Sequence, residues 1–377
     1  MKLTGFDIII VGPRRAGVIP AGAAPSVAIQ SLFVSLRDDV GTIGWGETCL
    51  YPGPGGITTN SARDALRQTI LPALLTLEFD GLEDAYRSAQ ELLRELPRDM
   101  LPAFCAAELA LLDVAGRRFR RSAGRILGPP LRAAIHYSGL VSTTDEAELV
   151  RDAGNLRRAG INHVKVAVTD DIQTNLRMMD IVRNRLGAEA EIRVRAAAGW
   201  TADEAMVQLE ALAPYRLAGI EQPVSPEDIE GLRQVTRAGL APVIADDSLV
   251  TVDDAARLIE SQACDVFSIR PAKCGGLINT ARIHSMARTA GLGCQLGALP
   301  GEGALLTAAG LQFACRAEGI RWVENGIDPL RGGNAISEPD LTPGPGGLAQ
   351  PLKGPGLGVR IRAERLMETA AQKISVG

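Results

Sequence analysis

The chain has 377 residues, of which 46% are hydrophobic, enough to bury one large domain with a smaller one attached. Its 40 lysines and arginines nearly balance 44 aspartates and glutamates, which argues against a nucleic-acid-binding protein with a concentrated basic face. No apolar run approaches the roughly 20 residues of a membrane span, so no membrane partner is expected. The six cysteines form no CxxC pair or zinc-type cluster, which favours reduced thiols and a cytoplasmic location.

The first 127 residues predict an α+β domain. Residues 26–47 alternate between apolar and polar side chains as an antiparallel hairpin does, with a turn at Asp38–Gly41. Three helix-period segments follow: "SARDALRQTILPALL", "GLEDAYRSAQELLREL" and "LPAFCAAELALLDVAGRRF". Two glycine- and proline-rich stretches, around residues 13–24 and 49–58, are interpreted as lid loops, with plain surface loops as the alternative.

From about residue 134, short β-branched runs alternate with amphipathic segments, which is typical of parallel strands with right-handed crossovers. Eight such runs predict a (β/α)7β TIM-like barrel over residues 128–327. Residues 328–377 are expected to return to the first domain, with its last strand in "GVRIRAERL". An open doubly wound sheet is the alternative, but no glycine-rich phosphate loop follows the first strand. Four predicted helices open with a capping residue: Thr144, Thr201, Ser225 and Thr251.

Polar side chains recur where the predicted barrel strands end. They are Lys165, Arg195, Glu221, Asp246 with Asp247, Arg270, and Glu302 after the seventh strand. One strand–helix unit separates Arg195, Glu221, Asp246 and Arg270 from one another, so their side chains are expected at one height around the barrel mouth. Paired carboxylates are a natural start for a divalent cation site, but the neighbouring strand offers Arg195 as its third group.

The sequence resembles the enolase superfamily, and within it the muconate-lactonizing-enzyme-like branch. The resemblance covers nearly the whole chain and rests on these stretches, which follow one another in family order: "GTIGWGE", "AAELALLDVAGR", "KVAV", "IRVRAAAGW", "IEQP", "IADDS", "IRPAKCGG" and "GPGLGV". It implies a barrel with a capping domain, Mg²⁺ held by three acids on successive strands, and lysine bases that remove a proton next to a carboxylate. It also implies a homo-oligomer and a small carboxylate substrate.

The match to the family's site is uneven. Lys165 matches the first lysine of the family's Lys-x-Lys motif, whereas Ala167 stands at the second, the usual base position. Glu221 and Asp246 match two metal ligands, but Arg195 stands at the first ligand and Ala197 at the asparagine that usually follows two positions later. On the sixth strand the base position holds Arg270, and Lys273 matches a second lysine further into the loop, while Glu302 matches an acid after the seventh strand. Asp247 stands where the family usually has glutamate.

These departures carry a chemical expectation. A guanidinium keeps its proton and has no free lone pair, so Arg195 cannot be a ligand. It is expected to occupy the metal volume beside Glu221 and Asp246 and to form bidentate pairs with them. We therefore expect no cofactor, with Glu221 and Asp246 as vestigial ligand positions, and take Mg²⁺ as the alternative.

The predicted protein is an isomerase or lyase acting on a small carboxylate. Its catalytic residues would be Lys165, Arg195, Arg270 and Asp247, and its substrate-binding residues Lys273 and Glu302. Lys165 is the first candidate for acid–base chemistry. Two other readings stay open: a non-catalytic relative that binds a ligand or partner, and an Mg²⁺-dependent cycloisomerase or racemase with rearranged ligands.

Overall fold

The structure is a computed structural model that describes residues 1–15, 28–50, 57–299, 301–326 and 336–376. Most of the two predicted lid loops, 13–24 and 49–58, lies outside the described residues. In the described part of the chain, no helix is long and apolar enough to cross a membrane.

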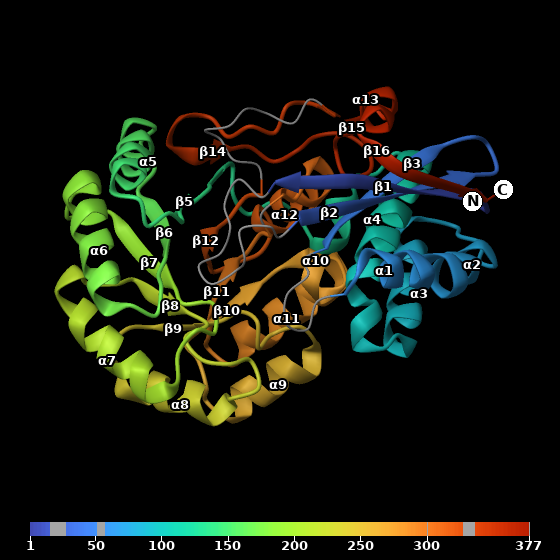
Figure 1. Ribbon diagram of the computed structural model, residues 1–377. Coiled ribbons are helices and arrows are strands. Elements are labelled where there is room, and N and C mark those ends of the chain that lie inside the picture. Colours follow the sequence, from blue (N-terminus) through green and yellow to red (C-terminus); the bar gives the residue numbers. More distant parts are fainter. Residues whose placement is uncertain (16–27, 51–56, 300, 327–335, 377) are drawn as a thin grey trace.

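Eight parallel strands form a curled sheet within the described residues, as the alternation of strand and helix patterns predicts (Figure 1). The sheet runs in sequence order from β5 to β12, and the backbone N–H of Ser138, just before β5, donates to the carbonyl of Val323 at the end of β12 over 2.7 Å. This hydrogen bond links the two ends of the sheet. The strands are β5 (Gly139–Val141), β6 (His163–Ala167), β7 (Glu191–Arg195), β8 (Gly219–Glu221), β9 (Val243–Ala245), β10 (Val266–Ile269), β11 (Gly293–Leu296) and β12 (Ile320–Val323).

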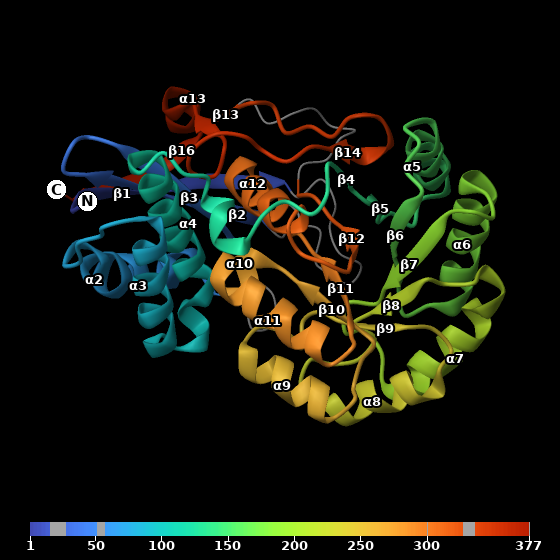
Figure 2. The same ribbon diagram turned by 180° about the vertical axis from the view of Figure 1, so that it is seen from behind.

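Helices follow the strands and cover the outside of the sheet (Figure 2). They are α5 (Glu146–Arg158), α6 (Ile172–Leu186), α7 (Ala202–Leu212), α8 (Ile229–Ala238), α9 (Val252–Glu260), α10 (Pro271–Cys274), α11 (Leu277–Thr289) and α12 (Ala304–Ala314). Thr201 and Thr251 form capping boxes, as predicted. The other two caps were placed wrongly, because an aspartate further along each loop accepts from the first turn: Asp145 caps α5 and Asp228 caps α8.

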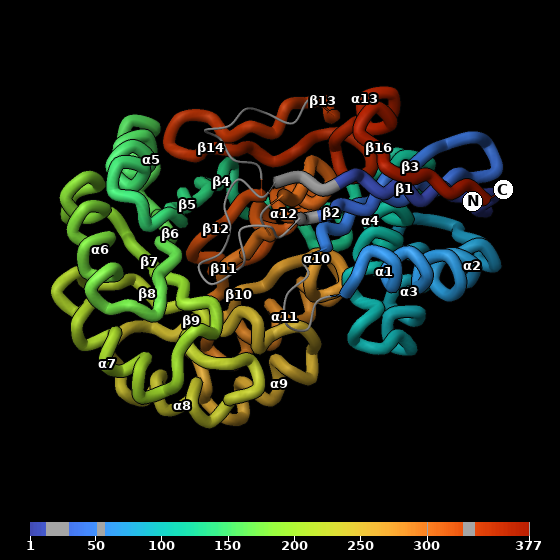
Figure 3. Tube along the Cα trace, in the orientation of Figure 1, coloured from blue at the N-terminus to red at the C-terminus, as the bar shows by residue number. Residues whose placement is uncertain are grey.

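The N-terminal part forms a separate antiparallel sheet in the order β16-β1-β2-β3. Its strands are β1 (Leu3–Arg15), β2 (Ala28–Asp38), β3 (Ile43–Leu50) and β16 (Ala370–Val376), and β2 with β3 is the predicted hairpin. Helices α1 (Thr59–Ala65), α2 (Leu71–Leu75), α3 (Leu82–Glu95) and α4 (Leu101–Arg118) accompany it. Figure 3 shows the two ends of the chain side by side in this sheet. The predicted fold class, a barrel with an α+β capping domain, is therefore confirmed.

The return of the chain to the capping sheet differs from the prediction in one detail. The stretch "GVRIRAERL" supplies the short β15 (Arg360–Ile361), which pairs with β13 (Ser337–Glu338), and then α13 (Ala363–Glu368). The strand that pairs with β1 is the following β16, whose partly exposed edge gave little hydrophobic signal. Another short pair, β4 (Ile135–His136) with β14 (Leu348–Ala349), lies beside the barrel. The boundaries after residues 127 and 327 stay predictions.

Three buried carboxylates connect the capping part to the barrel. Each is fully buried, and each accepts backbone N–H groups next to a glycine whose missing side chain leaves room for it. The pairs are Glu47 with Gly303 and the start of α12, Glu108 with Gly276 and the start of α11, and Asp113 with Gly356 and the N–H of Leu357. Helix α4, whose residues from Ala103 to Gly116 are buried, thus contacts both parts.

Candidate active site at the barrel mouth

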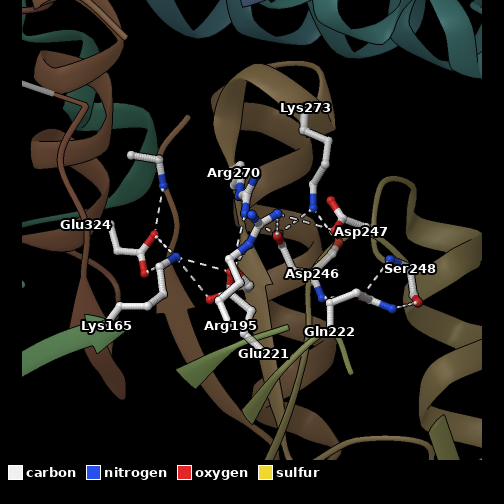
Figure 4. Close-up of polar contacts among 12 residues, drawn as sticks. Lys165, Arg195, Glu221, Gln222, Asp246, Asp247, Ser248, Arg270, Lys273 and Glu324 are labelled. Atoms are coloured by element: carbon white, nitrogen blue, oxygen red, sulfur yellow. Dashed lines mark hydrogen bonds and ion pairs between the residues drawn. The ribbon is translucent and has the colours of Figure 1, made fainter. Parts of the chain in front are cut away.

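Four charged side chains from successive strands meet at the carboxyl ends of the barrel strands (Figure 4). Arg195 and Glu221 are the last residues of β7 and β8, and Asp246 and Arg270 directly follow β9 and β10. Arg195 Nε donates to Glu221 Oε1 over 3.0 Å, and Arg270 Nη2 pairs with Asp246 and lies 3.5 Å from Glu221 Oε1. The regular spacing in the sequence therefore does place these four groups at one height.

Arg195 lies among the carboxylates rather than forming a two-pronged pair with one of them. Its Nη2 atom is 3.5 Å from Asp247 Oδ2 and 3.7 Å from Asp246 Oδ2, while Nε binds Glu221. Only 13% of the side chain is exposed. The guanidinium thus bridges β8 and the loop after β9, next to both expected acids, as predicted. The predicted bidentate pairs are wrong, because Nε binds Glu221 while Nη2 lies toward Asp246 and Asp247.

The backbone bends sharply directly after Arg195. Ala197 and Ala198 both have left-handed backbone angles, with φ of 53° and 62°. The N–H of Ala198 donates to the carbonyl of Gln222, and the indole N–H of Trp200 donates to the carbonyl of Thr169. Alanine is strained in this region, where asparagine or glycine is at ease, so this bend is held by its neighbours. It ends the strand and leaves Arg195 as its last inward residue.

Lys165 lies one strand away, between two carboxylates. Its Nζ atom is 3.1 Å and 3.2 Å from the two oxygens of Glu221 and 2.7 Å from the carboxylate of Glu324. Glu324, directly after β12, was not among the predicted site residues. Its inward direction could have been read from "IRWVENG", since it stands two residues after the buried Trp322 on the same side of the strand.

Glu324 stays ionised in this setting. Burial raises its pKa, but the positive charges of Lys165 and Arg193 outweigh this effect and hold the pKa below its usual value. Sequence reasoning also missed Gln295, whose side-chain amide donates to Glu221 Oε2 over 2.7 Å and thereby links β11 to the network.

On the other side of Arg195 lie Asp246, Asp247 and Lys273 (Figure 4). Lys273 Nζ is 2.9 Å from Asp246 Oδ1 and also donates to the Asp246 carbonyl. Burial opposes ionisation of Asp246, yet Arg270, Lys273 and Arg195 keep its pKa well below the usual range. Burial and the charge of Asp246 have the opposite effect on Asp247, whose pKa they raise. The two adjacent carboxyls therefore differ in basicity.

Glu302 lies apart from this network. It follows β11, it is 6% exposed, and its Oε1 atom accepts from the N–H of Leu299 over 2.9 Å. Burial raises its pKa to about 8. Among the described residues Glu302 makes no ion pair, so it presents a neutral carboxyl at neutral pH.

The side chains at the mouth do not fit an Mg²⁺ ion as they are arranged. The described residues contain no group of three or more histidines, cysteines, aspartates or glutamates that could hold a metal. The oxygens of Glu221 and Asp246 are already engaged by Lys165, Arg195, Arg270 and Lys273. Mg²⁺ requires near-octahedral oxygen ligands and avoids a fixed cation a few Å away, so this arrangement of side chains supports no catalytic step through the ion.

The fold and this mouth define a (β/α)7β barrel protein with a charged site at the carboxyl ends of its strands. Residues 148–365 match the sequence model of the family described as enolase C-terminal domain-like, and the chain belongs to this family. Its resemblance to that superfamily, inferred from the motifs, is thus confirmed.

Characterised relatives extend the comparison. The L-Ala-D/L-Glu epimerase of Bacillus subtilis is 29% identical over 72% of this chain and 73% of its own length. The N-succinyl-L-Arg/Lys racemase of Bacillus cereus is 24% identical over 98% of both chains, and its crystal structure superposes with a TM-score of 0.90 over 100% of both chains at 23% identity. Muconate cycloisomerase 1 of Rhodococcus opacus is 26% identical over 97% of this chain and 96% of its own length.

These relatives are epimerases, racemases and cycloisomerases, so the expectation of an isomerase-type enzyme is confirmed. The expectation that no cofactor is used is contradicted, because the relatives in this family are Mg²⁺-dependent enzymes. The expectation rested on one substituted ligand position, Arg195, and a single substituted ligand does not decide whether the whole protein uses a metal. The relatives depend on Mg²⁺, whereas the carboxylates at this barrel mouth are paired with arginine and lysine side chains.

Proposed function

We propose that the protein is an isomerase that moves a proton at the carbon next to a carboxylate in a small substrate bound at the barrel mouth. One observation carries the proposal: Lys165 and Asp247 lie on opposite sides of Arg195 and Glu221 (Figure 4). Their strands, β6 and β9, are separated by β7 and β8 in the sheet. Two proton-transfer groups facing each other across a site are what inversion at a carbon requires.

The reaction follows from these positions. Asp247, a stronger base than an ordinary aspartate because its pKa is raised, takes the proton from the carbon next to the carboxylate. The electron pair of that C–H bond moves into the carboxylate, and the charges of Arg195 and Arg270 stabilise the enolate that forms. The Lys165 ammonium then gives its proton to the opposite face of the carbon. Both groups return to their starting charge by exchanging protons with water.

Substrate binding is assigned to Lys273 and Glu302. The ammonium of Lys273 pairs with Asp246, the neighbour of Asp247 in the chain, and would attract the substrate carboxylate. The neutral carboxyl of Glu302 can donate a hydrogen bond to a polar group at the other end of the substrate. The relatives' names support substrates of this size: a dipeptide, an N-succinyl amino acid and muconate.

A substrate panel tests the proposal. Dipeptides, N-succinyl amino acids and muconate are each incubated with the protein in D₂O, with Mg²⁺ and with chelator, and followed by proton NMR. Loss of a substrate's α-proton signal and appearance of the isomer are expected for at least one class. Lys165→Met should abolish the appearance of the isomer, while the α-proton exchange carried out by Asp247 should continue. Lys353→Met, at an exposed lysine far along the chain, is the matched control. If the wild type exchanges no proton in any member of the panel, the proposal is wrong.

We propose a cytoplasmic homo-oligomer without a nucleic-acid or membrane partner. Each protomer would consist of a capping domain (residues 1–127), a barrel (128–327) and a C-terminal segment (328–377). Size-exclusion chromatography with light scattering measures the oligomeric state directly.

A further inference from the structure

A second arginine, Arg193, lies inside the barrel one layer below the mouth. It stands two residues before Arg195 on β7 and pairs in register with Lys165 on β6. Its side chain is wholly buried, one of the largest fully buried side chains of the protein. Barrel interiors of this kind are normally filled with branched aliphatic side chains. A buried cation here therefore calls for an explanation.

The partners of Arg193 all lie within the barrel. Its Nη1 atom is 3.2 Å from Glu324 Oε1 and donates to the side-chain oxygen of Gln295, and Nη2 donates to Ser138 Oγ over 3.0 Å. The guanidinium carbon lies 4.7 Å from the centre of the Trp322 ring. Among the described carboxylates, only Glu324 is within ion-pair distance of it.

Burying Arg193 in this way is an unfavourable means of increasing the stability of the fold. Burial of a guanidinium costs several kcal/mol, and a buried ion pair often adds less stability than apolar side chains of the same volume. The Nε atom of Arg193 has no hydrogen-bond partner among the described residues, which adds to the cost. Glu324 is moreover shared, since Lys165 Nζ lies 2.7 Å from the same carboxylate. Two buried cations thus converge on one acid.

We infer that Arg193 is a positioning residue that holds the Glu324 carboxylate in place for the Lys165 ammonium. Glu324 has a long side chain and directly follows β12. Besides the two cations, its carboxylate accepts a hydrogen bond from the backbone N–H of Ala298 over 3.4 Å. Arg193 approaches it from the layer below and contacts one carboxylate oxygen through Nη1, while Ser138 holds Nη2, so the rigid guanidinium fixes the position of that oxygen. Lys165 is then held between Glu324 and Glu221. The inference rests on the proposed function for what Lys165 does, but the placement of Lys165 can be measured without any turnover.

The composition of the chain makes that measurement simple. There are only five lysines, Lys2, Lys165, Lys273, Lys353 and Lys373, so protein labelled with ¹⁵N-lysine gives at most five ammonium signals. At one fixed pH near 6, a buried ammonium held by two carboxylates exchanges slowly with water and gives a sharp signal. Lys165→Met identifies the signal of Lys165 by its loss.

Three variants are compared with the wild type in this spectrum. Arg193→Met removes the charge and the guanidinium contact, and is expected to shift the Lys165 signal by more than the Arg316→Met control does, or to broaden it beyond detection. Arg193→Lys keeps the charge and should restore the signal in part. Arg316→Met is the matched control, because Arg316 is another buried arginine, bound to the oxygens of Gly128 and Gln312 away from the mouth.

A Lys165 signal that is unchanged in both Arg193 variants would overturn the inference. A Lys165 shift in Arg316→Met as large as the one in Arg193→Met would overturn it too. If Arg193→Met does not fold, Arg193→Lys alone decides, and a Lys165 signal identical to the wild type overturns the inference. With any substrate found in the panel, Arg193→Met should lower kcat at least tenfold and leave KM within threefold. A wild type without proton exchange refutes the proposed function, while the spectrum still tests Arg193.

Discussion

Glu302→Gln should change how the stability of the protein depends on pH. Glu302 has a pKa of about 8 in the folded protein, against an ordinary value of 4.5 for an exposed glutamate, because burial disfavours its charged form. The folded state therefore binds this proton more tightly than the unfolded state. Stability from this group is fully present below about pH 4.5 and is lost as the pH rises toward 8.

The size of the effect follows from the shift. Each pH unit within that window costs about 1.4 kcal/mol, and the whole window costs roughly 5 kcal/mol at most. Glutamine carries no charge at any pH, and its carbonyl oxygen can still accept from the N–H of Leu299. Between pH 5.5 and 7.5, the wild type should thus lose roughly 2 to 3 kcal/mol of unfolding free energy relative to Glu302→Gln.

Urea unfolding at pH 5.5, 6.5 and 7.5 measures this difference. Glu108, another buried acid with a pKa of about 8, is present in both proteins, so its contribution cancels. Glu260→Gln, at an exposed glutamate, reports what the same chemical change does at the surface. A difference between wild type and Glu302→Gln that stays constant within 0.5 kcal/mol over this range, about a third of one pK unit, would refute the reasoning.

Three further substitutions test other parts of the account. Ala197→Asn should stabilise the protein by about 1 kcal/mol, because asparagine tolerates the left-handed backbone found there; a lower melting temperature would contradict this. Gly276→Ala should destabilise the folded protein by about 2–4 kcal/mol, because a Cβ there meets the buried Glu108 carboxylate. The control Gly239→Ala, also at positive φ but with open space around it, should cost only about 1 kcal/mol. Arg195→Asp should raise Mg²⁺ affinity at least tenfold in calorimetry, because it removes a positive charge that repels the ion by up to roughly 8 kcal/mol at 4 Å; equal affinities would show that Arg195 does not oppose a metal.

The positions of the mouth residues could be predicted because a barrel repeats one geometry. The spacing from Arg195 to Arg270 fixes which strand carries each group and at what height, and the structure brings these groups together. Lys165, Asp247 and Lys273 join them for the same reason. Their chemical roles depend on substrate contacts and stay predictions.

What the sequence did not reveal depends on contacts between distant segments. The strand pattern indicates that Glu324 points inward, but no local pattern shows that it meets Lys165, or that Gln295 meets Glu221, across the barrel. The same holds for Glu47 and Glu108, whose apolar surroundings in the sequence resemble ordinary core positions. The cap at Asp145 was missed because the adjacent Thr144 is an equally good capping residue in the sequence. The edge strand β16 was missed because the preceding stretch "GVRIRAERL" also reads as a strand, and tertiary packing decides between such neighbours.

The central claim is that Lys165 and Asp247 act on opposite faces of one carbon. The most direct test follows α-proton exchange into D₂O from each enantiomer of a turned-over substrate separately. We expect Asp247→Asn to suppress exchange from one enantiomer and Lys165→Met to suppress exchange from the other, each by at least a hundredfold, as for loss of a general base. Equal loss from both enantiomers in one variant, with none in the other, would contradict it.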